Sequence, residues 1–253
     1  MKPRKALALL ALHPDQVISV SALVEELWGA SPPRSVQTTL QTYILQLRNL
    51  IAPTVGHDPD GLPRDAKSVL VTESGGYLLD TQGGTNDVQE FDRLAGAGHR
   101  ALTVGTPAAA SKLFRQALAL WRGPALVDVQ FGSLLEVEVT RLEASRLTVL
   151  SRCIEADLRL GRHHELIGEL SGLVARYPLD ESLHEKLMLA LYRAGRRSSA
   201  LEIYQRLRAV LRKELGIEPS LALRRMQQAV LASAPELDLR AAPGTPERLL
   251  AII

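Results

Sequence analysis

The sequence lacks most features that mark secreted and membrane-spanning proteins. Its single cysteine, Cys153, cannot form a disulfide within the chain, which argues against a secreted, disulfide-stabilised fold. No apolar run approaches the ~18 residues that cross a bilayer. The apolar run near the start, Ala6 to Leu12, is followed by His13-Pro14-Asp15 with no small-residue cleavage site. We therefore expect a helix of a cytoplasmic protein there and not a signal peptide.

Motifs for catalysis, cofactors and metals are also missing. The sequence contains no GxxxxGK[ST] stretch that would cradle a phosphate. His163 and His164 are neighbours, so on a helix they diverge by about 100° and do not share a face. Without a further ligand cluster they predict no metal site. Cys153 lies in an apolar helical run with no base placed by a motif, and we interpret it as a core residue. We therefore expect no enzyme, cofactor or metal.

Aromatic residues are scarce, at 4 %, while 46 % of residues are hydrophobic and 23 % charged. This composition favours Ala/Leu-rich helical packing in an ordinary globular protein. The length of 253 residues predicts two domains. Residues 1–80 carry seven Lys/Arg against eight Asp/Glu, so their net charge is −1. That balance argues mildly against nucleic-acid binding, which usually leaves a basic footprint.

Acidic residues are absent from residues 31–51. Ser31-Pro32-Pro33 interrupts any preceding helix, and Ser35 is the expected N-cap of a helix that continues to Ile51. Apolar residues at helical spacing predict one buried face: Val36, Leu40, Tyr43, Ile44, Leu47, Leu50 and Ile51. The other face carries neutral side chains and arginines: Arg34, Gln37, Thr38, Gln41, Thr42, Leu45, Arg48 and Asn49. Such a face suits base edges bordered by phosphates, which predicts a DNA recognition helix. An amphipathic helix with a merely solvated polar face is the alternative.

The neighbouring segments predict a helix-turn-helix with a wing. A helix over Lys5–Leu12 and an extended segment over Val17–Val20 precede a second helix, which we expect Ser21 to cap and Gly29 to end. Glu25 and Glu26 are then expected near its first turn. After a loop over residues 52–66, the runs 68–72 and 77–80 flank the turn Glu73-Ser74-Gly75-Gly76 and predict a β-hairpin. A hairpin after three helices indicates a wing, although a purely structural hairpin is the alternative.

Strand signals stop after residue 86, and the rest of the chain predicts helices. Residues 81–86 form a polar, glycine-rich linker, and helical patterns follow at 89–104, 106–122, 133–160, 162–177, 180–194, 196–213 and 218–233. Leu160-Gly161-Arg162 recurs as Ala194-Gly195-Arg196 after 34 residues. That spacing is the tetratricopeptide period, although helical hairpins of similar length could produce one such pair by chance. We predict an all-helical, tetratricopeptide-like domain.

Two parts of the sequence resemble one family. VSALVEELWGASPPRSVQTTLQTYILQLRNL and VLVTESGGYLLD resemble the winged-helix domain of the Streptomyces antibiotic regulatory protein family. NDVQEFDRLAGAGHRAL, ALALWRGPAL and the segment from ARYPLDESLHEKL to LRKELGIEPS are similar to the bacterial transcriptional activation domain that follows it there. The resemblance covers the chain up to about Leu231. It implies a mainly α protein with a winged helix-turn-helix at 1–80, a linker at 81–86, a helical activation domain at 87–234 and a tail at 235–253.

The resemblance also implies a function. Members of this family activate transcription of secondary-metabolite (antibiotic) gene clusters. They bind double-stranded DNA at direct repeats near a promoter as side-by-side protomers and recruit RNA polymerase. By this resemblance the helix Ser35–Ile51 enters the major groove, and the wing touches the adjacent minor groove or backbone. Gln37, Thr38, Gln41 and Thr42 would face bases, Ser74, Gly75 and Tyr77 would set the wing, and Arg34, Arg48, Lys2, Arg4 and Lys5 would hold phosphates.

The chain departs from the family pattern in three places. The family's winged helix begins with a small sheet, whereas this sequence opens at what would be the first helix, so we expect a truncated or misplaced start and a wing without sheet partners. Gln46 and Asn49 stand where the family often has basic residues. Leu45 points outward, where it would suit a thymine methyl or simply be exposed. The alternative function is a tetratricopeptide-like adaptor with little or no DNA binding.

Overall fold

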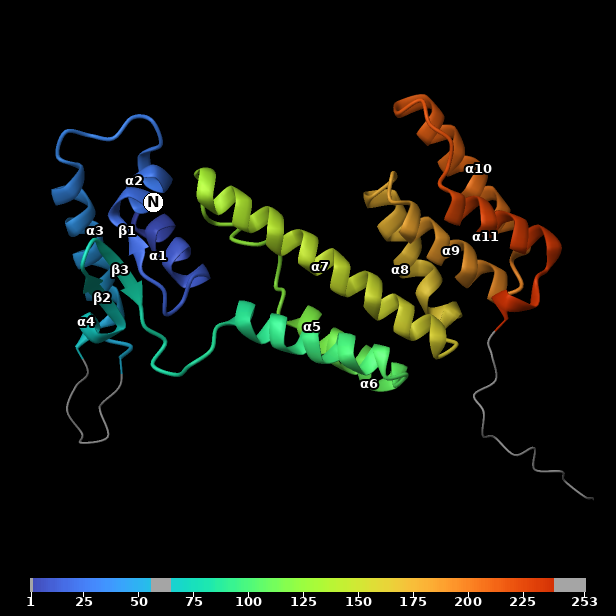
Figure 1. The fold of residues 1–253 in the computed structure, drawn as a ribbon, viewed down its shortest axis with the longest axis horizontal. Helices are drawn as coiled ribbons and strands as arrows, with labels where there is room; N and C mark the ends of the chain where they lie inside the picture. The colour runs from blue at the N-terminus through green and yellow to red at the C-terminus, as the bar shows by residue number, and fades with distance from the viewer. Residues whose placement is uncertain (1, 56–64, 239–253) are drawn as a thin grey trace, which may run out of the picture. The chain divides into compact units, whose positions relative to one another are not determined.

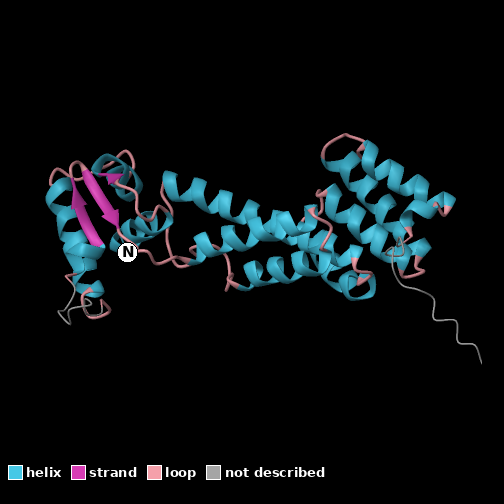
Figure 2. Cartoon of the chain, turned by 60° about the horizontal axis from the view of Figure 1, so that its bottom comes forward, coloured by secondary structure: helices cyan, strands magenta, loops and turns pink. Residues whose placement is uncertain are grey.

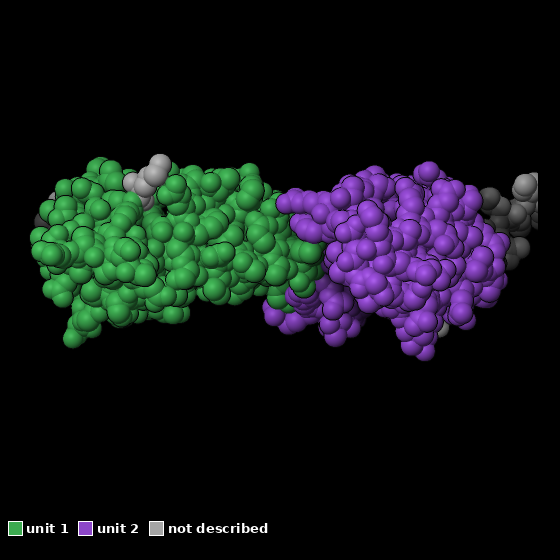
Figure 3. Space-filling model, turned by 90° about the horizontal axis from the view of Figure 1, so that it is seen from above, with its two compact units in different colours: residues 1–97, 114–149 green, residues 98–113, 150–253 purple. Residues whose placement is uncertain are grey.

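The computed structural model describes residues 2–55 and 65–238, and in this range the protein is mainly helical (Figure 1). The predicted loop at 52–66 and tail at 235–253 lie partly outside the described residues. The chain divides into two compact units (Figure 3). The first unit comprises residues 1–97 and 114–149, and the second comprises residues 98–113 and 150–253. None of the helices in the described ranges is both long and apolar enough to cross a membrane.

The first unit begins with three helices. They are α1 (Lys2–Leu12), α2 (Val20–Trp28) and α3 (Val36–Ile51). The predicted cap of α2 was wrong: Ser19 holds the N-cap position, and its side chain accepts a hydrogen bond of 3.1 Å from the Ala22 amide. Ser19 can do this because its backbone is extended, with φ −65° and ψ 152°, which aims the hydroxyl at the first turn. Glu25 and Glu26 therefore lie beyond the first turn of α2, contrary to expectation.

A small antiparallel sheet packs beside these helices (Figure 2). Its strand order is β1-β3-β2. Its strands are β1 (Ile18–Ser19), β2 (Leu70–Glu73) and β3 (Gly76–Leu79). The expectation that the wing would lack sheet partners was wrong, because Ile18 pairs with Tyr77 and Ser19 with Gly76. A glycine is needed at 76, since a Cβ there would lie 2.3 Å from the Ile18 carbonyl oxygen.

Strand β2 starts later than predicted. Residues 66–69 form a short helix, α4 (Ala66–Val69), instead of the beginning of the strand. The Asp65 side chain caps this helix by accepting a hydrogen bond of 3.0 Å from the Lys67 amide. A side-chain acceptor at this point favours one helical turn over an extended backbone, which a β-propensity argument does not take into account.

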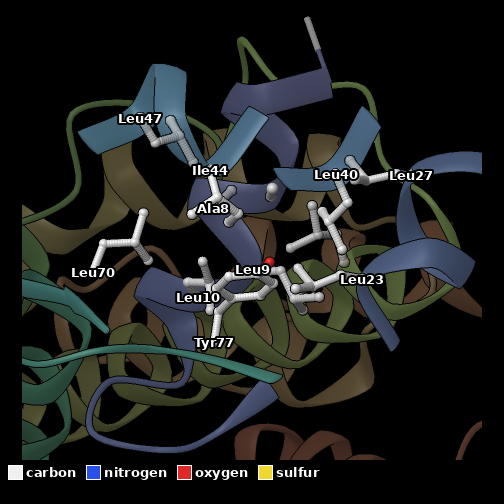
Figure 4. Packing of buried hydrophobic residues seen from close by; sticks show 12 residues of the cluster. Ala8, Leu9, Leu10, Leu23, Leu27, Leu40, Ile44, Leu47, Leu70 and Tyr77 are labelled. Carbon is white, nitrogen blue, oxygen red and sulfur yellow. The ribbon is translucent and has the colours of Figure 1, made fainter. Parts of the chain in front are cut away.

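The core of the first unit lies between α1, α2, α3 and the sheet (Figure 4). Leu40, Ile44 and Leu47 of α3 point toward α1 and are at most 2 % exposed, which confirms the predicted face. Leu50 was predicted to be buried and is instead 71 % exposed, because Leu47 and Ile51 turn toward the core and leave Leu50 beside that stripe. Leu135 belongs to the same core at 0 % exposure, although it lies in α7 (Ser133–Arg159).

The remaining elements are helical, as predicted. They are α5 (Asp87–Thr103), α6 (Pro107–Ala119), α8 (His163–Arg176), α9 (Glu181–Arg193), α10 (Arg197–Glu214), α11 (Leu221–Ala232) and a 3-10 turn at Pro235–Leu237. The two glycines of the proposed repeat adopt matching left-handed conformations, with φ +78° at Gly161 and +74° at Gly195. The amide after each glycine donates to a carbonyl five residues back, at Asp157 and Leu191. Equivalent turns 34 residues apart support the tetratricopeptide-like reading.

Candidate nucleic-acid interface

The exposed face of α3 is rich in free hydrogen-bonding groups. Arg34, Gln37, Gln41 and Asn49 are exposed, and their side chains make no hydrogen bond or ion pair within residues 2–55 and 65–238. No acidic side chain lies on the helix. Unpaired donors and acceptors on a rigid helix are available to base edges and phosphates without breaking internal contacts.

The threonines of this face are partly engaged. Thr42 donates its hydroxyl proton to the Thr38 carbonyl at 2.9 Å, which leaves its methyl group and an acceptor lone pair facing outward. Thr38 is exposed. Ser35 holds the N-cap position, yet its side chain makes no capping bond, and its hydroxyl instead lies 3.4 Å from that of Thr39. The amides of the first turn of α3 are therefore not covered by this side chain.

Leu45 lies on the same face and is 57 % exposed. A single exposed leucine is ordinary on a protein surface, and its side chain is available to a partner. Contact with a partner's apolar group would recover that surface.

Arg48 differs from the other arginine of the face because it is bound to the wing. Its Nε and Nη2 donate to the Leu70 carbonyl at 2.9 and 2.6 Å, and Nη2 also donates to the Thr72 hydroxyl at 2.8 Å. These bonds link the end of α3 to β2. Arg48 therefore positions the wing against the helix, a role that the sequence analysis did not predict.

The hairpin tip and Tyr77 have separate roles. Ser74 and Gly75 are exposed, and Gly75 has φ +83°, which a left-handed turn position requires. The Gly75 carbonyl accepts a hydrogen bond of 2.9 Å from the Val20 amide, so the tip is held beside α2. Tyr77 is only 7 % exposed and belongs to the core. Its side chain packs in the core, so Tyr77 contributes to the wing through the sheet that it supports.

Each member of the predicted basic cluster at the start of the chain has a partner within the protein. The Lys2 ammonium lies 4.5 Å from the centre of the Trp28 ring, and Arg4 forms an ion pair of 2.9 Å with Asp128. Lys5 donates to the Glu26 carbonyl at 2.9 Å, and its side chain is only 15 % exposed. Lys5 therefore has a structural role, and its ammonium is largely withdrawn from solvent.

Sequence reasoning missed Glu26, which connects the helix-turn-helix to α7. Its carboxylate is 1 % exposed and accepts hydrogen bonds from the amides of Gly132, Leu134 and Leu135, at 2.5, 2.9 and 3.1 Å. These are the unpaired amides of the α7 N-terminus, so Glu26 acts as its cap from another part of the chain. Glu25 and Glu26 are adjacent glutamates, and nothing in the sequence indicates which of the two is buried.

Other contacts fix the segment 81–86 to α1 and to the turn that follows it. Asp15 accepts hydrogen bonds of 2.7 Å from both the amide and the hydroxyl of Thr81, which lower the pKa of its carboxyl below 3.8. Asn86 donates to the Ala11 carbonyl at 2.8 Å and caps α5 by accepting from the Gln89 amide. The predicted linker is thus held by specific hydrogen bonds at both ends.

In the described part of the chain, no three His, Cys, Asp or Glu side chains gather in a way that could hold a metal ion. The buried Cys153 lies near Ser111 and Asp157 in the second unit. Asp157 is fully buried and accepts hydrogen bonds from the Ser111 hydroxyl and from Arg162, at 2.7 and 2.9 Å. This cluster joins α6, α7 and the following turn, and its chemistry is that of a structural network.

Comparison with known proteins shows that each of the two parts of this chain matches a described family. Residues 2–79 match the family described as "Transcriptional regulatory protein, C terminal", and residues 86–231 match "Bacterial transcriptional activator domain". The Regulatory protein DnrI of Streptomyces peucetius is 52 % identical over 94 % of this chain and 86 % of its own length. The Transcriptional regulator RedD of Streptomyces coelicolor is 37 % identical over 95 % of this chain and 67 % of its own length.

A solved structure shares the fold. Mycobacterium tuberculosis EmbR in complex with a low-affinity phosphopeptide superimposes with a TM-score of 0.84 at 31 % identity, covering 92 % of this chain and 60 % of EmbR. A winged helix-turn-helix, a helical activator domain and these relatives agree with the resemblance read from the sequence. The chain belongs to the Streptomyces antibiotic regulatory protein family of DNA-binding transcriptional regulators.

Proposed function

We propose that this protein activates transcription of a secondary-metabolite gene cluster by placing α3 in the major groove of promoter DNA. The observation that carries the proposal is the acid-free face of α3, whose Arg34, Gln37, Gln41 and Asn49 side chains are exposed and unpaired in the described part of the chain. Glutamine and asparagine can make paired hydrogen bonds to adenine, and arginine suits phosphate or guanine.

Each exposed group has a role in this proposal. Gln37, Thr38, Gln41 and Thr42 face bases, Leu45 packs on a thymine methyl, and Arg34 and Asn49 bind the flanking backbone. Ser74 and Gly75 bring the wing to the neighbouring backbone or minor groove. Arg48 acts mainly by orienting that wing, since its guanidinium is bound to Leu70 and Thr72. Lys2 and Arg4 are secondary candidates, because both already have partners within the protein.

The DNA-binding surface carries little charge, which favours binding of several protomers to one stretch of DNA. One protomer offers few free cations, so the electrostatic contribution of phosphates to its affinity is modest. Protomers side by side on direct repeats would add their contacts and gain affinity through a raised effective concentration. The helical domain, residues 87–234 in this proposal, would then recruit RNA polymerase in the cytoplasm. No catalytic step is part of the proposed function.

Gel-shift titration of the Gln41→Ala variant tests the base-reading role. Loss of a bidentate contact should weaken the matched promoter site by about 1–3 kcal/mol and leave scrambled DNA nearly unchanged. Gln46→Ala is the matched control, because Gln46 is exposed one turn away on the same helix and has no assigned base contact. Equal losses on both DNAs for Gln41→Ala would refute base reading. No shift by the wild-type protein, alongside a stable protein complex, would support the adaptor function instead.

A further inference from the structure

A cleft of about 380 Å³ lies within the first unit, beside α1, the start of α5 and the segment 120–128. Its volume is within the range of small-molecule sites. None of its lining residues has an assigned part in DNA binding. Its walls are mainly apolar, and the largest side chains are Leu12, Phe91, Trp121, Leu126 and Leu142.

An aromatic pair forms the fixed wall of this cleft. The rings of Phe91 and Trp121 meet edge to face, with centroids 5.6 Å apart and planes at 80°. Phe91 is 2 % exposed, and the Arg146 guanidinium lies 4.8 Å from the Trp121 ring centre while also donating to the Gly123 carbonyl. A wall held from several sides is ordered before a ligand arrives, which lowers the entropic cost of binding another ring.

The charges at the rim indicate the sign of the ligand. Arg122 is exposed and has no hydrogen-bond or ion-pair partner in the described residues. Asp128, also at the rim, is already paired with Arg4 at 2.9 Å. Asp87 lies in the first turn of α5, where the helix N-terminus offsets its negative charge. Arg122 is therefore the rim charge with the least compensation, and it favours an anion.

We propose that this cleft binds a flat, mostly apolar aromatic molecule that carries one acidic group. The rings would pack against Trp121, which Phe91 supports from within the core, and the acid would pair with Arg122. Such a ligand would touch α1 of the DNA-binding region and α5 of the activator region together. It would strengthen the contact already made where Asn86 donates to the Ala11 carbonyl at 2.8 Å.

Fluorescence titration of the full chain with anilinonaphthalene sulfonate, an aromatic anion, tests the proposal. In a Trp28→Phe background Trp121 is the sole tryptophan, because the chain has two. We expect saturable quenching of Trp121 emission as probe emission rises. Arg122→Gln should weaken binding about tenfold through the lost charge-assisted bond. Arg34→Gln is the matched control, since it removes another exposed, unpaired arginine outside the cleft, and it should leave the affinity for the probe unchanged although it alters DNA binding.

Two further measurements separate the cleft from unspecific binding. Ala11→Leu places a larger side chain in the cleft and should abolish saturable quenching while circular dichroism stays that of the wild type. The neutral analogue phenylnaphthylamine should bind Arg122→Gln and wild type alike, because it has no acid. The proposal would be overturned if Arg122→Gln and a folded Ala11→Leu both bound the probe as tightly as wild type. It would also be overturned if probe emission rose without quenching of Trp121. If Arg122→Gln weakens binding of the neutral analogue as much as it weakens binding of the acidic probe, the proposed pairing of Arg122 with the acid is refuted.

Discussion

Replacement of Glu26 by alanine should destabilise the protein more than any other change of an acidic residue near the DNA-binding helix. The carboxylate is buried and accepts three amide hydrogen bonds from the α7 N-terminus, and Lys5 lies 3.6 Å away. Alanine leaves the three amides without their acceptor and removes the carboxylate that faces the Lys5 ammonium. Orphaned groups of this kind are among the few causes of large mutational losses.

The expected loss of unfolding free energy can be worked out from the two interactions that Glu26 makes, the helix cap and the ion pair. Loss of a helix N-cap alone costs about 1 kcal/mol, and loss of one partner of a buried ion pair about 3–5 kcal/mol. Since Lys5 keeps its bond to the residue 26 carbonyl, we expect Glu26→Ala to lower the free energy of unfolding by about 3 kcal/mol. In a chain of this size that corresponds to a Tm lower by roughly 6–12 °C.

Urea denaturation followed by circular dichroism measures this effect, and Glu25→Ala is its control. Glu25 is exposed and loses only one hydrogen bond of 3.0 Å, from the Ser133 hydroxyl, so its replacement should cost less than about 0.5 kcal/mol. Gly132→Ala should reproduce the Glu26 effect without removing a charge, because a Cβ there would lie 2.4 Å from the Glu26 carbonyl oxygen. Equal stabilities of the Glu26→Ala and Glu25→Ala variants would refute the capping role.

Four further changes probe the remaining features. Arg34→Gln should reduce the slope of log affinity against log salt by about 0.9, the value for one phosphate contact, and an unchanged slope would remove Arg34 from the backbone contacts. Arg48→Lys keeps the charge but loses the forked bonds to Leu70 and Thr72, so it should weaken binding to all DNA sequences; full affinity in this variant would restore a phosphate role. The hydrogen bonds from Thr81 lower the pKa of the Asp15 carboxyl, so they stabilise the protein above the ordinary carboxyl pKa of about 3.9, and this stability is lost as pH falls through the lower folded pKa. Wild type should therefore lose more stability than Asp15→Asn as the pH is lowered through and below that ordinary pKa, which urea titrations at each pH would measure. Gly195→Ala should cost about 1 kcal/mol in urea denaturation because its φ is +74°, whereas Gly168→Ala, at a helical position with open space, should not destabilise.

Local patterns gave the helices of this protein correctly and their ends less well. Leu40, Ile44 and Leu47 recur at helical spacing, and their burial follows from that spacing alone. Ser19 and Ser21 are equally good caps in sequence, and only the extended backbone of β1 selects Ser19. Leu50 fits the apolar period, yet it lies beside the stripe that Leu47 and Ile51 turn to the core, and only the packing shows where that stripe ends.

The binding face and its supports were predictable to different degrees. The free side chains of α3, such as Gln41, are functional candidates from sequence because nothing in their own helix occupies them. Arg48 looks identical to Arg34 in that pattern, but β2 lies 22 residues further along the chain and takes its hydrogen bonds. The extended segment over Val17–Val20 was predicted and contains β1, but its pairing with β3 was missed because two residues are too few for a periodic signal that names a partner strand.

The sequence by itself determined the order of helices, the winged helix-turn-helix, the repeat turns and the family, because each is written in short-range spacing and in motifs. Only the tertiary structure decided which polar residues are free and which are used internally. Lys5, Glu26 and Arg48 are engaged by groups at least 21 residues away, and a cleft opens beside Trp121. Such pairings depend on how elements distant in the chain pack together, and periodicity within one element does not contain that information.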